Sequence, residues 1–194
     1  WFKRKKDDLK PVNKKDMPDG LWIRCDKCSE IIYKKELEKK LYVCPKCDYH
    51  FRITSKIYID LLLDPKSFNE IDSNIKSADP LKFKDSKKYS DKYKASVKKT
   101  GLNEAVVTGS AKLDGREIII CIMDFSFLGG SMGSVVGEKI SRAIDVALQD
   151  KKPLIILSAS GGARMHEGVL SLMQLAKTSA KLALLSEAKI PYIS

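Results

Sequence analysis

The stretch that decides the fold is Pro153–Gly168, with the sequence PLIILSASGGARMHEG. It opens with the apolar run Leu154–Leu157, which lies between proline and glycine residues and predicts a strand buried on both faces. Gly161 and Gly162 predict a turn, and a helical pattern starts near Glu167. A glycine lets a ligand approach the backbone closely, and the first turn of a helix adds partial positive charge. We therefore expect free N–H groups to converge here and form an oxyanion hole.

Three common site signatures are absent from this turn. It contains no G-x-S-x-G nucleophile elbow, no G-x-x-x-x-G-K-[ST] phosphate loop and no G-x-G-x-x-G dinucleotide fingerprint. The predicted site is therefore built from backbone donors rather than from a nucleophilic side chain. The alternative is an ordinary turn between a strand and a helix, whose glycines only permit close packing.

From Glu104 onward the chain has the pattern of an α/β core. A second glycine-rich loop, 125–133, also joins a predicted strand to a predicted helix, and Gly129, Gly130 and Ser131 are its candidate substrate-binding residues. We expect the two loops to form a cleft at one end of the sheet, although the glycines of the second loop could also serve packing alone. An Asp-Gly pair at 114–115 predicts a hairpin turn. The expected elements are strands 105–112 and 117–124, helix 134–149, strand 154–157, helix 167–187 and strand 190–194.

Four cysteines form two C-x-x-C pairs, Cys25/Cys28 and Cys44/Cys47, with fifteen residues between the pairs. This arrangement suits a tetrahedral Zn²⁺ ion, and the spacing falls in the zinc-ribbon range. A closed site of four thiolates has no open position for a substrate, so its role is structural. Two disulfides are the alternative, but they need an oxidising compartment and no export signal is visible. Short strands at 31–33 and 41–43 are expected between the pairs.

The charge is unevenly distributed along the chain. Of the net charge of +11, residues 1–104 carry +9 and residues 105–194 carry +2. The basic half could face nucleic acid, a phosphorylated cofactor or an acidic protein, or it could be an ordinary lysine-rich surface. The sequence contains no run of 18 apolar residues, so no membrane span is expected. The expected parts are a flexible basic N-terminus (1–20), a zinc ribbon (21–53), a helical and loop connector (54–103) and the core (104–194).

Several motifs together resemble one known family. They are the ribbon, Lys99–Leu102, Phe127–Gly133, Val136–Lys139, Ser158–Met165, Ser171–Ser179 and Pro191–Ser194. In this order they are similar to the carboxyltransferase beta subunit of bacterial and plastid acetyl-CoA carboxylase, from about residue 21 to the last residue. Members of the family generally continue further, so the chain is expected to be truncated at its C-terminal end.

The resemblance implies a crotonase-like ββα spiral preceded by a small zinc ribbon with four cysteine ligands. It implies a biotin-dependent enzyme that moves the carboxyl group of carboxybiotin, held on the biotin carrier protein, to acetyl-CoA and gives malonyl-CoA, the first committed step of fatty acid synthesis. Gly161 and Gly162 would bind the thioester oxygen through their N–H groups. Ala163 and Arg164 are further candidate substrate-binding residues, and Arg164 could instead contact the partner subunit, bind a CoA phosphate or form a surface salt bridge.

The resemblance also implies partners. Activity needs an alpha subunit of the same fold in an α2β2 heterotetramer, and the biotin carboxyl carrier protein and biotin carboxylase are further partners. ATP binding by the whole enzyme, and a location in the cytoplasm or in the plastid stroma of a plant, follow from the resemblance as well.

Some features leave alternatives open. His166 stands where the family more usually has Gln, and a histidine beside the hole invites a role as general base, although the family mechanism uses biotin itself. A crotonase-type acyl-CoA hydratase or hydrolase would share the hole, but it would usually lack the ribbon. A zinc-ribbon nucleic-acid-binding protein would explain the basic half but not the glycine turn. The ribbon itself could touch RNA or cover the CoA site.

Overall fold

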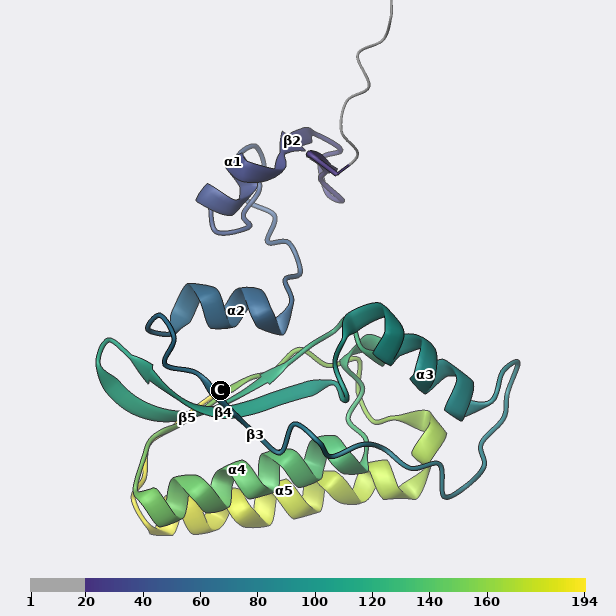
Figure 1. Ribbon diagram of the computed structural model, residues 1–194, viewed down its shortest axis with the longest axis vertical. Helices are drawn as coiled ribbons and strands as arrows, with labels where there is room; N and C mark the ends of the chain where they lie inside the picture. The colour runs from purple at the N-terminus through teal and green to yellow at the C-terminus, as the bar shows by residue number, and fades with distance from the viewer. Residues whose placement is uncertain (1–19) are drawn as a thin grey trace, which may run out of the picture. The chain divides into compact units, whose positions relative to one another are not determined.

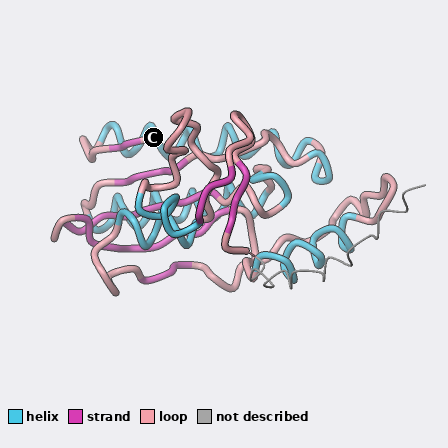
Figure 2. Tube along the Cα trace, turned by 90° about the horizontal axis from the view of Figure 1, so that it is seen from above, coloured by secondary structure: helices cyan, strands magenta, loops and turns pink. Residues whose placement is uncertain are grey.

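The computed structural model describes residues 20–194, which form two compact units that divide between Arg52 and Ile53. Figures 1 and 2 show their elements as ribbon and tube, with helices in cyan and strands in magenta in Figure 2. The basic N-terminal segment expected at 1–20 lies, except for its last residue, outside the described part. Among the described residues no helix is both long and apolar enough to cross a membrane.

The first unit is the small ribbon. It contains the antiparallel strands β1 (Trp22–Arg24) and β2 (Ile31–Tyr33), followed by the short helix α1 (Lys34–Lys39). Its core consists of Ile32 and Leu37 packed against buried cysteines. The strand expected at 41–43 was wrong, because positive φ angles at Leu41 and Tyr42 break the extended backbone, and only Val43 forms an isolated bridge, to His50.

The second unit is built on a five-stranded sheet with the order β3-β4-β5-β6-β7. The first three strands run antiparallel, and β5, β6 and β7 run parallel to one another. Asp114 and Gly115 both have positive φ in the turn between β4 and β5, as expected for a tight Asp-Gly hairpin. The strands are β3 (Asn69–Ile71), β4 (Val106–Leu113), β5 (Arg116–Met123), β6 (Leu154–Leu157) and β7 (Tyr192–Ile193).

Helices cover both faces of this sheet. The long helices α4 (Ser134–Asp150) and α5 (Val169–Glu187) lie side by side on one face, and α2 (Ser55–Leu62) lies on the other (Figure 1). The central strand β5 is therefore buried on both faces. Its residues 119, 121 and 123 pack into the cluster beneath α4, and residues 118, 120 and 122 pack on the side of α2. This ββα order confirms the predicted α/β core.

Edge strand β3 was not predicted, because three residues, Asn69–Ile71, give too short a pattern to stand out from the polar segment around them. It pairs with β4, where a Cβ on Gly109 would lie 2.4 Å from the ring of Phe68, so glycine makes room for that ring. Residues 53–103 thus belong to the same compact unit as the sheet. They also contribute the helix α3 (Tyr89–Thr100), which ends at Gly101 with a φ of 73°.

Candidate functional site

The two glycine-rich loops lie against each other at the carboxyl ends of the parallel strands β5 and β6, as predicted. Backbone hydrogen bonds join them. The Met132 N–H donates to Gly162 O at 2.8 Å, the Arg164 N–H donates to Met132 O at 2.9 Å, and the Gly161 N–H donates to Gly129 O at 2.9 Å. The loops therefore form one structural unit at the end of the sheet.

The two glycines of the turn differ in what their N–H groups do. The Gly161 N–H takes part in the bond that joins the loops, whereas the Gly162 N–H donates to the hydroxyl of Ser160 at 3.0 Å. A serine hydroxyl leaves by a rotation about one bond, so the Gly162 N–H is the donor that a ligand oxygen can take over most easily. Gly162 is exposed and has a φ of 110°, which favours glycine.

The helix after the turn begins later than predicted. A short 3₁₀ turn, η2 (Met165–Glu167), comes first, and α5 starts at Val169 after Gly168. Gly168, with a φ of 54° and a ψ of −133°, is not helical and separates the 3₁₀ turn from α5. Gly162 is therefore separated from the first turn of α5 and does not lie at the positive end of its dipole.

The candidate residues of the second loop serve packing more than the sequence suggested. Gly130 is buried with a φ of 65°, and a Cβ there would lie 2.1 Å from the carbonyl oxygen of Ala159. Gly129 also has positive φ but has open space where a Cβ would be. Ser131 accepts a hydrogen bond from the Arg164 Nε through its hydroxyl, at 3.2 Å. Of the two glycines, only Gly129 leaves open space where a Cβ would lie, and the Ser131 hydroxyl is already used by Arg164.

Arg164 has no exposed side-chain surface, so it offers neither the expected contact with a CoA phosphate or the partner subunit nor a surface salt bridge. Its guanidinium group forms an ion pair with the buried Glu104 and lies 3.4 Å from an oxygen of Glu167. Burial would lower the pKa of Arg164, but the Glu104 carboxylate raises it above its usual value. The guanidinium is thus a charged internal group, and in this arrangement it is closed to a ligand.

Glu167 completes this cluster. Its Oε2 accepts the Ser134 N–H at 2.6 Å, at the first residue of α4, and its Oε1 accepts the Tyr89 hydroxyl at 2.9 Å. Burial would raise the pKa of Glu167, but the hydrogen bonds from Ser134 and Tyr89 lower it below its usual value. Glu104, Glu167 and Tyr89 were missed by sequence reasoning, and the only signal was a pair of charged residues, 164 and 167, beside a glycine turn.

His166 lies next to Tyr89, which belongs to the same cluster. Its ring stacks on Tyr89 at 4.9 Å between centroids, contacts Phe83 edge-on, and its Nε2 lies 3.4 Å from the Nζ of Lys92. Its Nδ1 is buried without a hydrogen-bond partner. Burial, followed by the charge of Lys92, lowers the pKa of His166 below its usual value, so the neutral ring is favoured.

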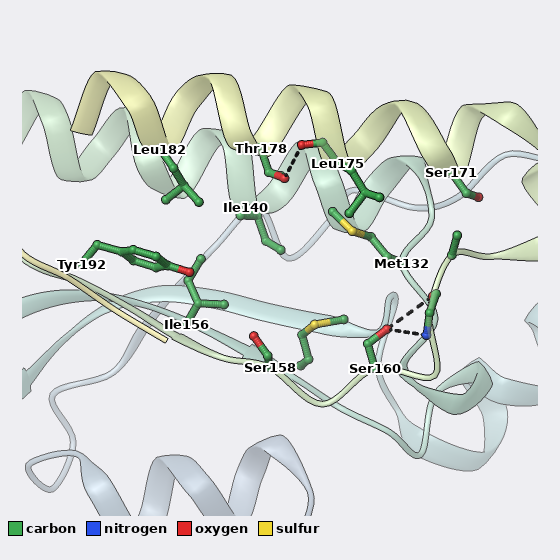
Figure 3. Close-up of a pocket in the computed structure, with 13 residues that line it drawn as sticks. Met132, Ile140, Ile156, Ser158, Ser160, Ser171, Leu175, Thr178, Leu182 and Tyr192 are labelled. Carbon is green, nitrogen blue, oxygen red and sulfur yellow. Dashed lines mark hydrogen bonds between the residues drawn. The ribbon is translucent and has the colours of Figure 1, made fainter. Parts of the chain in front are cut away.

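An apolar cavity of about 360 Å³ opens beside Gly162. It lies between the sheet and the helices α4 and α5, and Figure 3 shows Ile140 and Leu182 pointing from the helices toward Ile156 on the sheet. Hydroxyl groups of serine, threonine and tyrosine are interspersed among apolar side chains. The thirteen lining residues are Met123, Met132, Ile140, Ile156, Ser158, Ser160, Gly162, Ala163, Ser171, Leu175, Thr178, Leu182 and Tyr192.

The four predicted metal ligands come together in the ribbon. The sulfur atoms of Cys25, Cys28, Cys44 and Cys47 all lie within 4.8 Å of one another, and none of them forms a disulfide. Two of the sulfur pairs are 3.7 Å apart, close to the separation of about 3.8 Å that four sulfurs have around zinc at ~2.3 Å. The donor set and its geometry therefore fit a tetrahedral zinc ion.

The fold, the paired glycine loops and the four-cysteine ribbon define a crotonase-like carboxyltransferase with an N-terminal ribbon. The Carboxyl transferase domain family matches residues 52–194, and the Acetyl-CoA carboxylase zinc finger domain matches residues 22–47. Two similar proteins are acetyl-coenzyme A carboxylase carboxyl transferase subunits beta. That of Citrifermentans bemidjiense is 52% identical over 196 residues, and that of Prosthecochloris aestuarii is 50% identical over 194 residues. The chain belongs to this family of beta subunits, and it spans 70% of the length of both relatives, which match over the whole of this chain.

Solved structures share the fold. The transcarboxylase 12S structure with methylmalonyl-coenzyme A and methylmalonic acid bound has a TM-score of 0.58 and 29% identity, over 70% of this chain and 24% of the other. The beta subunit of geranyl-CoA carboxylase from P. aeruginosa has a TM-score of 0.55 and 20% identity, over 81% of this chain and 25% of the other. The second likeness concerns the fold alone.

Proposed function

We propose that this chain is the part of an acetyl-CoA carboxylase that transfers the carboxyl group from carboxybiotin on the biotin carrier protein to acetyl-CoA, giving malonyl-CoA. The observation that carries the proposal is the match over the whole chain, at about half identity, to beta subunits of that enzyme. The paired glycine loops and the adjoining apolar cavity are consistent with this chemistry.

Carboxyl transfer to a thioester passes through an enolate, whose oxygen carries negative charge. Carboxybiotin, when bound, supplies the carboxyl group. The Gly162 N–H, released from Ser160, would donate to the thioester oxygen and stabilise the charge that develops on it. An N–H donor does not have to change its protonation state. The apolar lining of the cavity would help to keep water from the reacting carbon once a partner closes the cavity.

A strongly basic surface near the glycine loops would suit the phosphate groups of coenzyme A. Eight lysines and two aspartates lie between residues 82 and 99, and seven of these lysines are exposed. The segment adjoins the loops through Lys92, which lies beside His166, and through Tyr89, which lies beside Arg164. This placement suggests that the lysines bind phosphate as well as keeping the protein in solution.

No P-loop signature lies beside the glycine turn, and we do not propose ATP binding by this chain.

An apolar face on α5 would suit the alpha subunit. Val169, Leu172, Met173 and Leu175 are all more than half exposed, and the exposed positions between 169 and 184 are all apolar except for Ser179. A helix face of this kind is expected to be covered in an assembly. We propose that an alpha subunit of the same fold covers it and completes the site in an α2β2 complex.

A cytoplasmic or plastid location, and contacts with biotin carboxylase or RNA, remain predictions.

The proposal is tested by reconstitution. The beta subunit, continued to the full length of its relatives, is mixed with alpha subunit, carboxylated biotin carrier protein and acetyl-CoA, and malonyl-CoA is measured. We expect product only with acetyl-CoA and both subunits present. Absence of product from a complex that has formed would contradict the proposal, and hydration or hydrolysis of an acyl-CoA would point instead to a crotonase-type hydratase or hydrolase.

A further inference from the structure

The side chain of Arg164 is the largest fully buried side chain of the described residues, although it carries a permanent charge. A buried guanidinium is costly unless all of its donors are used. Here Nη1 donates to Glu104 Oε2 at 2.9 Å and to Tyr89 Oη at 3.0 Å. Nη2 donates to Glu104 Oε1 and to Ser131 O at 2.8 Å, and Nε donates to the Ser131 hydroxyl. The whole planar fork is therefore occupied.

The charges of this cluster explain why it is stable inside the protein. Two carboxylates face one guanidinium, so Glu104, Glu167 and Arg164 together carry one excess negative charge. The N–H at the start of α4 and the Tyr89 hydroxyl both donate to Glu167 and compensate for it. Burial raises the pKa of Tyr89 to about 12, so its hydroxyl keeps its proton at neutral pH. The cluster thus holds the start of α4, the start of α3 and the turn η2 together.

Arg164 follows the glycine turn in the chain and contacts the neighbouring loop, 125–133, through both its backbone and its side chain. Its backbone N–H donates to Met132 O, and its side chain donates twice to Ser131. Gly133 leaves the space for this contact, because a Cβ there would lie 2.6 Å from Glu167 Oε1 and 2.9 Å from Arg164 Nη1. Glycine-rich loops have few side chains of their own to fix them, and Arg164 supplies that constraint.

We propose that Arg164 is a positioning residue of the carboxyltransferase site, which aligns the Gly162 N–H by locking the Ser131 loop against the glycine turn. The inference rests on the proposed function. Its physical basis is that a donor acts on the transition state only if it is already aimed at the developing oxyanion, and a displacement of about 1 Å can cost on the order of 10²-fold in rate. Because the guanidinium is closed to ligands, its loss should affect kcat more than substrate binding.

The test is Arg164→Lys in the reconstituted complex, with Arg142→Lys as the matched control. Arg142 is a half-exposed arginine of α4 that pairs with Glu138 and Asp72. A lysine keeps the charge at 164, but it cannot reach Glu104 and Ser131 together as the planar fork does. At a temperature well below the melting temperature of the variant, we expect kcat to fall at least tenfold, while KM for acetyl-CoA stays within about twofold. Arg142→Lys should leave both constants unchanged.

A second readout does not depend on activity. Hydrogen exchange of peptides covering 128–133 and 160–164 should become faster in Arg164→Lys, while peptides of the ribbon keep their wild-type rates. This result supports the positioning role even if the wild-type complex acts on another substrate, and an inactive wild-type complex would instead count against the proposed function.

Three outcomes would overturn the inference. A raised KM with unchanged kcat would make Arg164 a substrate-binding residue. A lower melting temperature with normal kcat and normal exchange in the loops would make its role purely structural. If Arg164→Lys does not fold, Ser131→Ala removes only the hydroxyl acceptor of Arg164 Nε, and normal kcat with normal loop exchange in that variant would also reject the role.

Discussion

At the scale of single residues, the candidate site consists of backbone groups whose directions are set by a few backbone conformations. Gly162 combines a φ of 110° with an N–H held only by the Ser160 hydroxyl. Gly130 instead packs so closely on Ala159 that a side chain cannot fit. Two glycines in neighbouring loops thus serve different ends, one for a candidate donor and one for packing.

Substitution of Gly162 by valine should damage the site without unfolding the chain. No atom lies within 4 Å of the position that a Cβ would take, so a clash is not the cause, but a β-branched residue is strained at this φ and the N–H must turn away. We expect kcat of the complex to fall at least tenfold, toward the roughly 10²–10³-fold typical of a lost oxyanion donor. Zinc content and alpha-subunit binding should persist. Near-normal rates would remove Gly162 from the mechanism.

His166→Gln should alter the pH dependence of stability rather than the rate. The lowered pKa of His166 means that the unfolded chain, with a pKa near ~6.5, binds the proton more readily than the folded chain does. The wild-type protein should therefore lose stability as the pH falls below about 6.5, with Lys92, Arg164, Asp85 and Glu167 as the charged neighbours of the ring.

The comparison is made by thermal melts at about pH 7.5 and about pH 5.5, on either side of the unfolded pKa. Glutamine carries no titrating group, so the variant should lose less of its melting temperature between the two values than the wild type does. Equal losses would contradict the assignment, and complete loss of activity in this variant would favour a histidine base over the backbone hole.

At the scale of elements, each unit depends on a different kind of contact. The ribbon has a small apolar core around Ile32 and Leu37 and relies on its cysteines. The larger unit relies on β5, which is apolar on both faces, and on the helices that cover it. A change in the metal site should therefore remain local to the ribbon.

Cys44→Ser tests the metal site. Metal analysis of protein purified without chelator should find one Zn²⁺ per wild-type chain and little or none in the variant, because a serine is a poor substitute for the fourth thiolate. Exchange or proteolysis should show the ribbon loosened and the sheet intact. Cys121→Ala, in the buried strand β5, is the control and should keep the zinc. A wild-type protein without metal would contradict the assignment.

Leu172→Asp tests the apolar face of α5. The side chain is 57% exposed, so the isolated chain should keep its fold, whereas a carboxylate buried in an interface without a partner is strongly unfavourable. We expect binding to the alpha subunit to weaken at least tenfold, measured by pull-down or titration. Ser186→Asp, an exposed position near the end of the same helix, should bind normally. Unchanged binding by Leu172→Asp would place the interface elsewhere.

At the scale of the whole molecule, the described part of the chain has one candidate donor turn beside an open apolar cavity. The chain spans 70% of the length of its relatives. We expect the chain alone to form no malonyl-CoA from acetyl-CoA and a biotin carboxyl donor, and activity to require the full-length beta subunit with its alpha subunit. Robust transfer by this chain in isolation would contradict the shared-site interpretation.

The sequence by itself determined the local elements and the metal ligands. The apolar run before Gly161, the Asp-Gly turn and the two C-x-x-C pairs predict structure from neighbouring residues alone, because their signals are local. Helix α4 follows for the same reason, since its apolar residues recur along one face.

Only the tertiary structure decided what those elements do together. The Arg164 cluster joins residues that are far apart in the chain. Glu104 and Ser77 lie 60 and 87 positions before Arg164, and no local sequence pattern predicts their contact with it. The same holds for the N–H of Gly161, which donates to Gly129 O of the neighbouring loop. These features depend on long-range hydrogen bonds and burial, and those arise only once the chain has folded.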